Sequence, residues 1–310
     1  MARLARFKMK EDESWYHVYS RASGEEVNYP LKDRLCQRKM IEIIKHFTEA
    51  YMCEVGAFCI MGNHYHIVLR FASFRKLSRE ELIERAVIFY PNSSKWLKSW
   101  IEEDWARFEE RIFDLSEYMR NVQSAFARWY NRTYRRFGRL WADRFKSLYL
   151  EDLRSVLDCV LYVELNPVRA GLVSRPEVWK GSSCYLRDCG TSDWIMPLGL
   201  IMNEDSSDLF KLYRGLLYYR GGVPTKEGQA SISEEIIREE EERGFVSSGM
   251  YRKRLRYFVD GVILGSEGFI RQQLQQMRET GHYLRRKNPT THLDGIHLTL
   301  REQRSHAVCF

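Results

Sequence analysis

The segment Ala57–Arg70 constrains this chain more than any other, because two short apolar runs flank the turn dipeptide Gly62-Asn63. This pattern is typical of a β-hairpin. His64 and His66 stand at the start of its second strand, and residues two apart on a strand point to the same face. We therefore expect two imidazoles side by side, which either ligate one divalent ion or lie on a solvated sheet face.

Strands and helices alternate around this hairpin in the order of a small α+β domain. Runs of β-branched, aromatic and other apolar residues predict strands over Ser14–Ser20, Tyr51–Met61, His64–Phe71 and Phe145–Leu150. Apolar residues at helical spacing predict helices over Leu31–Ala50, from Asp114 or Ser116 onward, and over Leu153–Leu165. The order β-α-β-β-α-β predicts a ferredoxin-like fold, in which helices flank an antiparallel sheet.

The chain has 310 residues, which suggests one main domain with an additional region. We expect the main domain over residues 1–190, interrupted by a helical insertion at about 72–112 that opens with the capping box Ser78-Arg79-Glu80-Glu81. That insertion is interpreted as a variable elaboration or a DNA-facing flap. Residues 191–310 are expected to be helical, as a DNA-binding accessory or a small packing bundle.

A basic and aromatic stretch follows the long helix that begins near residue 115. The formal net charge is +7, and between Trp129 and Lys146 the only acidic residue is Asp143. A solvated helix end would carry acidic residues among the basic ones, whereas a groove for single-stranded nucleic acid combines Arg with aromatic rings. The expected DNA contacts are Arg128, Arg132, Arg135, Arg136, Arg139, Trp141, Arg144 and Lys146, with His17 and Arg21 from the first strand.

Tyr162 and Asn166 are four residues apart and share a face at the end of a short helix, which we expect to stop at Asn166-Pro167. Taken singly, each is more often a core aromatic or a helix-ending turn residue than a functional group. Tyr130 and Tyr134 have the same spacing and are alternative nucleophiles.

Three pieces in this order resemble the REP-associated tyrosine transposases, which are single-tyrosine members of the HUH (His-hydrophobic-His) group. They are Asn63-His64-Tyr65-His66, residues 138–147 and residues 162–171. The resemblance covers about residues 1–190. Two positions depart from the usual pattern, because Gly62 replaces a proline and the middle residue Tyr65 is aromatic.

The resemblance implies that His64, His66 and Asn166 bind a divalent metal, Mg²⁺ or Mn²⁺, and that Tyr162 is the catalytic nucleophile. It also implies a substrate of single-stranded DNA carrying a hairpin, cleaved and rejoined through a covalent 5′-phosphotyrosine. Arg144 is a candidate for the scissile phosphate, and His17 either lies beside the metal or packs in the core. The alternatives are a domesticated, sequence-specific DNA-binding protein without strand transfer, and a structural metal-binding or RNA-binding protein.

Seven cysteines are scattered along the chain with no CxxC pair. An odd number without paired spacing indicates free thiols in a reducing compartment. No continuous apolar run reaches 18 residues, so no membrane span is expected. We therefore expect a cytoplasmic, nucleoid-associated protein that acts as a monomer or homodimer.

Overall fold

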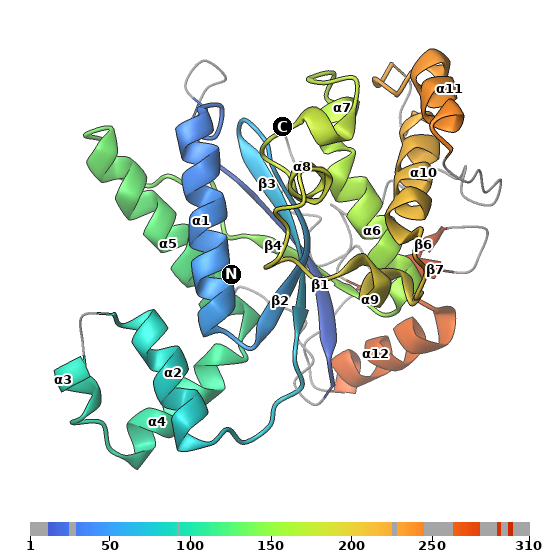
Figure 1. Cartoon of the computed structure of the whole chain (residues 1–310). Helices are drawn as coiled ribbons and strands as arrows, with labels where there is room; N and C mark the ends of the chain where they lie inside the picture. Colours follow the sequence, from blue (N-terminus) through green and yellow to red (C-terminus); the bar gives the residue numbers. More distant parts are fainter. Residues whose placement is uncertain are drawn as a thin grey trace.

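The structure is a computed structural model. It describes residues 12–24, 29–91, 94–224, 228–244, 263–279, 290–292 and 297–299. The described strands form one sheet in the order β2-β3-β1-β4-β5-β7-β6 (Figure 1). They are β1 (Ser14–Arg21), β2 (Cys53–Ile60), β3 (His64–Phe71), β4 (Lys146–Leu150), β5 (Ile263–Gly265), β6 (Thr290–His292) and β7 (His297–Thr299). The first four strands are antiparallel and follow the order 2-3-1-4. The expected ferredoxin-like α+β fold is confirmed.

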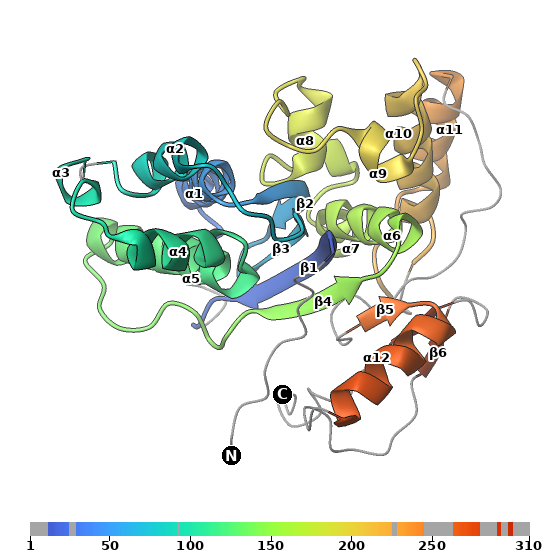
Figure 2. The ribbon, with the colours of Figure 1, turned by 90° about the horizontal axis from the view of Figure 1, so that it is seen from below.

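One face of the sheet is covered by α1 (Arg34–Ala50) and α5 (Leu115–Thr133) (Figure 2). Each helix begins at an aspartate whose carboxylate accepts backbone N–H groups of the first turn, Asp33 for α1 and Asp114 for α5. The apolar stripes of both helices pack on alternate residues of the strands, including Tyr16 of β1 and Ile67 of β3. This layer is a hydrophobic core.

The opposite face carries α6 (Leu153–Glu164), which packs on β2, β3 and β4. The chain then continues through α7 (Asn166–Arg169), α8 (Ser183–Asp188), α9 (Leu198–Met202), α10 (Leu209–Gly221) and α11 (Glu234–Glu242). α6 ends at Glu164, just before Asn166-Pro167, as the sequence pattern predicts. The sequence pattern does not predict the further short helix that follows. A proline is tolerated in the first turn of a helix because its missing N–H has no partner there, and α7 begins at this step.

The insertion contains α2 (Arg79–Phe89), α3 (Ser94–Leu97) and α4 (Glu102–Ile112). The predicted capping box is present, because Ser78 and Glu81 exchange side-chain and backbone hydrogen bonds. Aromatic rings of the insertion contact one another, and α2 packs on α1 while α4 packs on α5. The insertion is therefore fixed to the α1/α5 side of the domain.

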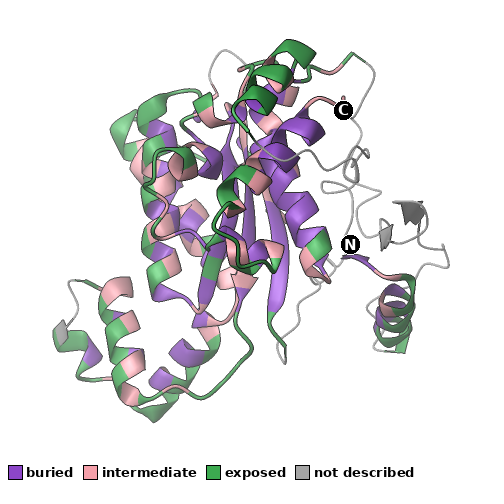
Figure 3. Ribbon diagram, turned by 45° about the vertical axis from the view of Figure 1, so that its right-hand side comes forward, coloured by how far each residue is buried: buried purple, intermediate pink, exposed green. Residues whose placement is uncertain are grey.

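The C-terminal region contains helices, as expected, and also strands that the sequence pattern does not predict. Residues 263–265 form β5, which pairs parallel with β4 and extends the sheet. Ser266 then accepts the N–H of Phe269 at the start of α12 (Glu267–Glu279). In Figure 3 the central strands are buried whereas much of α12 is exposed. One face of this helix, which includes Ile270 and Leu274, packs on the domain, and the opposite face is open to solvent.

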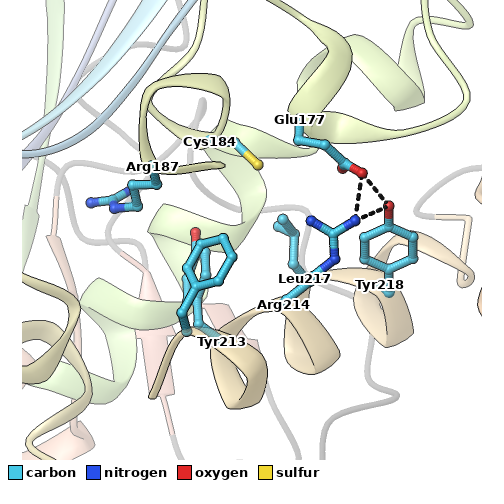
Figure 4. Close-up of a pocket in the computed structure, with 8 residues that line it drawn as sticks. Glu177, Cys184, Arg187, Tyr213, Arg214, Leu217 and Tyr218 are labelled. Carbon is cyan, nitrogen blue, oxygen red and sulfur yellow. Dashed lines mark hydrogen bonds and ion pairs between the residues drawn. The ribbon is translucent and has the colours of Figure 1, made fainter. Parts of the chain in front are cut away.

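Buried ion pairs join the later helices to the domain. Glu164, at the end of α6, is fully buried and accepts hydrogen bonds from Ser183, Arg187 and Tyr213. Nearby, Arg214 and Tyr218 of α10 point toward the Glu177 carboxylate (Figure 4). The cavity beside them is about 10 Å³, which is room for one water molecule and not for a substrate.

The six cysteines in the described ranges are free thiols, five of them buried. Among the helices that the structure describes, none is long and apolar enough to span a membrane.

Candidate active site

A set of polar residues lies on the α6 face of the sheet, at the end where β3 begins. The β1–β3 register places Tyr19 opposite His66 and Arg21 opposite His64, and β4 places Lys146 opposite Tyr19. Directly opposed residues of antiparallel strands share a face. The two histidines therefore point to the same side, as strand spacing predicts, together with Tyr19, Arg21 and Lys146.

Tyr162 of α6 lies over this set of residues. The centroid of its ring is 5.7 Å from that of His66 and 6.0 Å from that of His17, with the rings nearly perpendicular in both pairs. Nε2 of His17 lies 2.9 Å from Nδ1 of His66, and both imidazoles are 1% exposed. The fold thus brings a tyrosine from the second half of the domain against histidines of β1 and β3.

His64 has one ring nitrogen available for a ligand. Its Nδ1 lies 2.6 Å from Oδ1 of Asn63. An amide oxygen only accepts hydrogen bonds, so Nδ1 carries the proton and Nε2 presents a lone pair. Holding the proton on one nitrogen is how proteins orient metal-binding histidines.

Both histidines are held in their neutral form. Burial, with a contribution from the charge of Arg21, lowers the pKa of His64 to about 4. Burial also moves the pKa of His66 well below its usual value, and His17 and His64 add to this shift. A neutral imidazole is the form that binds a metal.

Asn166 lies at the start of α7, one turn after Tyr162. Its Nδ2 donates to the carbonyl oxygens of Tyr162, at 2.9 Å, and Val163, at 3.3 Å. The amide nitrogen is therefore used in the helix, which leaves Oδ1 as the atom that can ligate.

The described part of the chain has no group of three or more His, Cys, Asp or Glu side chains that could hold a metal ion. A metal bound here would therefore need the amide oxygen of Asn166 beside the two neutral imidazoles. Imidazole nitrogen and carbonyl oxygen are both accepted by Mn²⁺, so the chemistry of this donor set fits a divalent ion.

The basic loop, residues 134–145, runs beside the same end of the sheet. Ala142 N–H donates to the carbonyl of Arg21, and Ser23 N–H donates to the carbonyl of Leu140. Because Arg21 is opposite His64, these bonds fix the loop next to the histidines. Arg139 and Arg144 of this loop, and the half-buried Trp141 between them, also line a groove of about 500 Å³ along α5.

The predicted DNA-contacting arginines are placed along the end of α5 and this loop. Within the described ranges, none of the six arginines of this stretch takes part in an ion pair. Arg136 is partly buried, and the other five are exposed: Arg128, Arg132, Arg135, Arg139 and Arg144. Lys146 lies apart from them at the start of β4, opposite Tyr19 of β1.

The aromatic rings of this stretch divide into two kinds. Trp141 has its ring centroid 5.4 Å from that of Tyr65 and donates its indole N–H to the carbonyl of Gln123, so it anchors the loop to the core. Phe137 is 93% exposed, between Arg136 and Gly138. The sequence analysis selected Trp141 as a DNA-contacting ring, but Phe137 is the more exposed ring of this loop, and Tyr134 is also exposed.

Of the alternative tyrosines, Tyr130 lies on α5, on the other face of the sheet, and Tyr134 directly follows this helix. Tyr134 donates its hydroxyl hydrogen to Asp33, at 2.6 Å, and this bond raises the pKa of Tyr134 above its usual value. Tyr130 packs between the rings of Phe126 and Tyr134. The structure does not bring either tyrosine to His64 and His66.

Arg169 is a site residue that the sequence analysis did not select. Its guanidinium lies over the Tyr162 ring, 5.4 Å from the centroid. The only signal in the sequence was its position seven residues after Tyr162, about two helical turns.

No protein-family model and no curated protein matches this chain. Among solved structures, the chain is similar to a REP-associated tyrosine transposase bound to a REP hairpin, with 14% sequence identity and a TM-score of 0.42. The match covers 67% of this chain and 96% of the other. At this level of similarity it carries no argument about what this chain binds or catalyses.

Proposed function

We propose that this protein cleaves and rejoins single-stranded DNA beside hairpins, with Tyr162 as the nucleophile and a divalent metal held by His64, His66 and Asn166. The observation that carries the proposal is the position of the Tyr162 ring, 5.7 Å from that of His66 of the same chain. A tyrosine placed beside paired neutral imidazoles combines a nucleophile with a metal-binding site. The same observation supports a tyrosine that acts within its own chain.

The reaction exchanges one phosphodiester bond for another. Oη of Tyr162 forms a bond to phosphorus, the bond from phosphorus to the 3′-oxygen breaks, and the proton lost by the phenol is balanced by the proton gained by the leaving oxygen. The products are a 5′-phosphotyrosine and a free 3′-OH. A 3′-OH can then attack the phosphotyrosine and release Tyr162, so strands are rejoined without ATP.

His64, His66 and Asn166 would hold the metal. When bound, a divalent ion supplies positive charge that offsets the charge of the phosphate oxygens. Two neutral imidazoles and one amide form an uncharged donor set that suits Mn²⁺ better than Mg²⁺, because Mg²⁺ prefers oxygen ligands. We therefore expect higher activity with Mn²⁺.

The basic loop and the end of α5 would bind the DNA strand. Exposed arginines without protein partners can contact phosphates, and an exposed ring can stack on a base. Phe137 and its neighbouring arginines provide both kinds of contact, in the loop that is bonded to Arg21 and Ser23 at the end of β1.

The test uses hairpin-bearing single strands, labelled at the end that stays with the tyrosine, incubated with the full chain and Mn²⁺ or Mg²⁺. A denaturation-resistant protein–DNA adduct supports the proposal. Tight hairpin binding without an adduct under any metal would favour the non-cleaving DNA-binding protein. Nucleic-acid affinity that a chelator leaves unchanged, together with a large thermal destabilisation, would favour a structural metal.

A further inference from the structure

Arg169 ends α7 and holds its guanidinium over the ring of Tyr162. Its Nε and Nη1 atoms are buried and have no hydrogen-bond partner. A buried polar group without a partner costs free energy, and more so when it is charged. The ring of Tyr162 offsets part of this cost, but no hydrogen bond to Nε or Nη1 offsets the rest.

Three other largely buried arginines on this side of the sheet are paired. Arg187 is bound to Glu164, Arg214 to Glu177 and Glu240, and Arg220 to Asp158. By contrast, no ion pair in the described ranges involves Arg169. Burial lowers its pKa, and the nearby Arg220, which is itself bound to Asp158, adds to this shift.

Burial lowers the pKa of Arg169 to about 10, which still leaves the guanidinium charged at neutral pH. A charged guanidinium with donors unused and another cation nearby favours an anion that comes from outside the chain.

We propose that Arg169 is an anion-binding residue that takes a non-bridging oxygen of the DNA phosphate joined to Tyr162. This inference deepens the proposed function and rests on it for the identity of the ligand. Arginine suits the role because its planar N–H donors match two oxygens of one phosphate. While the phosphorus–Oη bond forms and the phosphorus–O3′ bond breaks, Arg169 keeps its proton and offsets charge on the phosphate oxygens.

The competing interpretation is that Arg169 only stacks on Tyr162 to stabilise the fold. The two interpretations differ in what removal of the charge does. If stacking is its role, Arg169→Met lowers the melting temperature. If it is an anion site, Arg169→Met in phosphate-free buffer leaves the melting temperature unchanged or raises it, because an unpaired buried charge has been removed.

A first experiment titrates the full chain with inorganic phosphate in the presence of a chelator, at constant ionic strength. The melting temperature of the wild type should rise with phosphate, because a ligand that binds the folded state stabilises it. Arg169→Gln should show no rise, whereas the control Arg154→Gln, an exposed arginine of α6, should behave as wild type. An equal rise in Arg169→Gln, or no rise in the wild type, would overturn the anion site.

A second experiment measures the rate of adduct formation on hairpin DNA. Arg169→Gln should slow it by about 100-fold, as is typical when one donor to a developing oxyanion is lost, with part of the rate recovered in Arg169→Lys. An unchanged rate in Arg169→Gln contradicts the inference and leaves the proposed function intact. If phosphate stabilises the wild type but not Arg169→Gln, and the wild type forms no adduct with DNA, the anion site is supported and the proposed function is contradicted.

Discussion

Nε2 of His17 lies 2.9 Å from Nδ1 of His66, and neither imidazole is open to solvent. Such a bond needs one nitrogen that donates and one that accepts. It therefore cannot form when both histidines are imidazolium ions, because every ring nitrogen is then a donor. The hydrogen bond joins His17 to His66, and the ring of Tyr162 packs against both histidines.

The lowered histidine pKa values predict a loss of stability in mild acid. In the unfolded chain an imidazole binds a proton near pH 6.5, whereas folded His64 does so only near pH 4. The unfolded state therefore binds more protons between these values, and the free energy of unfolding falls as pH drops through this window, by at most about 1.4 kcal/mol per pH unit per histidine. Urea unfolding from pH 7.5 to 4.5 measures the slope. His64→Gln should flatten it, and an unchanged slope in this variant would contradict the burial of a neutral His64.

His17 should matter for metal binding more than for folding. His17→Phe keeps a ring in the core but removes the bond to His66, so we expect Mn²⁺ affinity to fall by about 10–100-fold. The rise in melting temperature with Mn²⁺ gives the affinity, and His46→Phe, at an exposed position of α1, is the control. Equal Mn²⁺ titrations for wild type and His17→Phe would show that His17 only fills space.

The fully buried Glu164 should be a sensitive point for stability. Glu164→Gln leaves the buried Arg187 without its counter-charge, which should reduce the free energy of unfolding by about 3–5 kcal/mol. Denaturant unfolding measures it, with the exposed pair Glu234–Arg238 as the matched control: Glu234→Gln should have little effect. A loss no larger than that of the control would mean that the buried pair contributes nothing net.

Two aromatic residues of the basic loop, Phe137 and Trp141, should separate binding from folding. Phe137→Ala should weaken single-stranded DNA binding by about 1–3 kcal/mol with no change in melting temperature, because the ring is 93% exposed. Trp141→Ala should lower the melting temperature, because its ring packs against Tyr65 and Phe126. Fluorescence anisotropy and thermal unfolding measure the two effects. The opposite assignment of effects would restore Trp141 as the base-contacting ring.

Local patterns predicted the elements whose residues alternate clearly. The bounds of β3 are those expected from its alternating side chains, and Asp114 begins α5 because its carboxylate accepts two N–H groups of the first turn. By contrast, β5 is three residues long and pairs with β4, which is more than a hundred residues earlier. A strand so short has no periodicity to detect, and its partner is set by tertiary structure.

The candidate site was predictable in part for the same reason. Strand spacing places His64 and His66 on one face, but only the packing of α6 brings Tyr162 to His66. The unpaired state of Arg169 depends on which side chains surround it, and no local pattern contains that information. Likewise Phe137 and Trp141 are both aromatic residues among arginines in the sequence, and only their different burial in the fold distinguishes them.

The central claim is most directly tested by locating the DNA attachment in the adduct. After reaction with hairpin-bearing DNA and Mn²⁺, nuclease and protease digestion followed by mass spectrometry identifies the modified tyrosine. The account predicts a phosphonucleotide on Tyr162, no adduct in Tyr162→Phe, and a normal adduct in Tyr130→Phe and Tyr134→Phe. An adduct that persists in Tyr162→Phe, or a modification on Tyr130 or Tyr134, would contradict it.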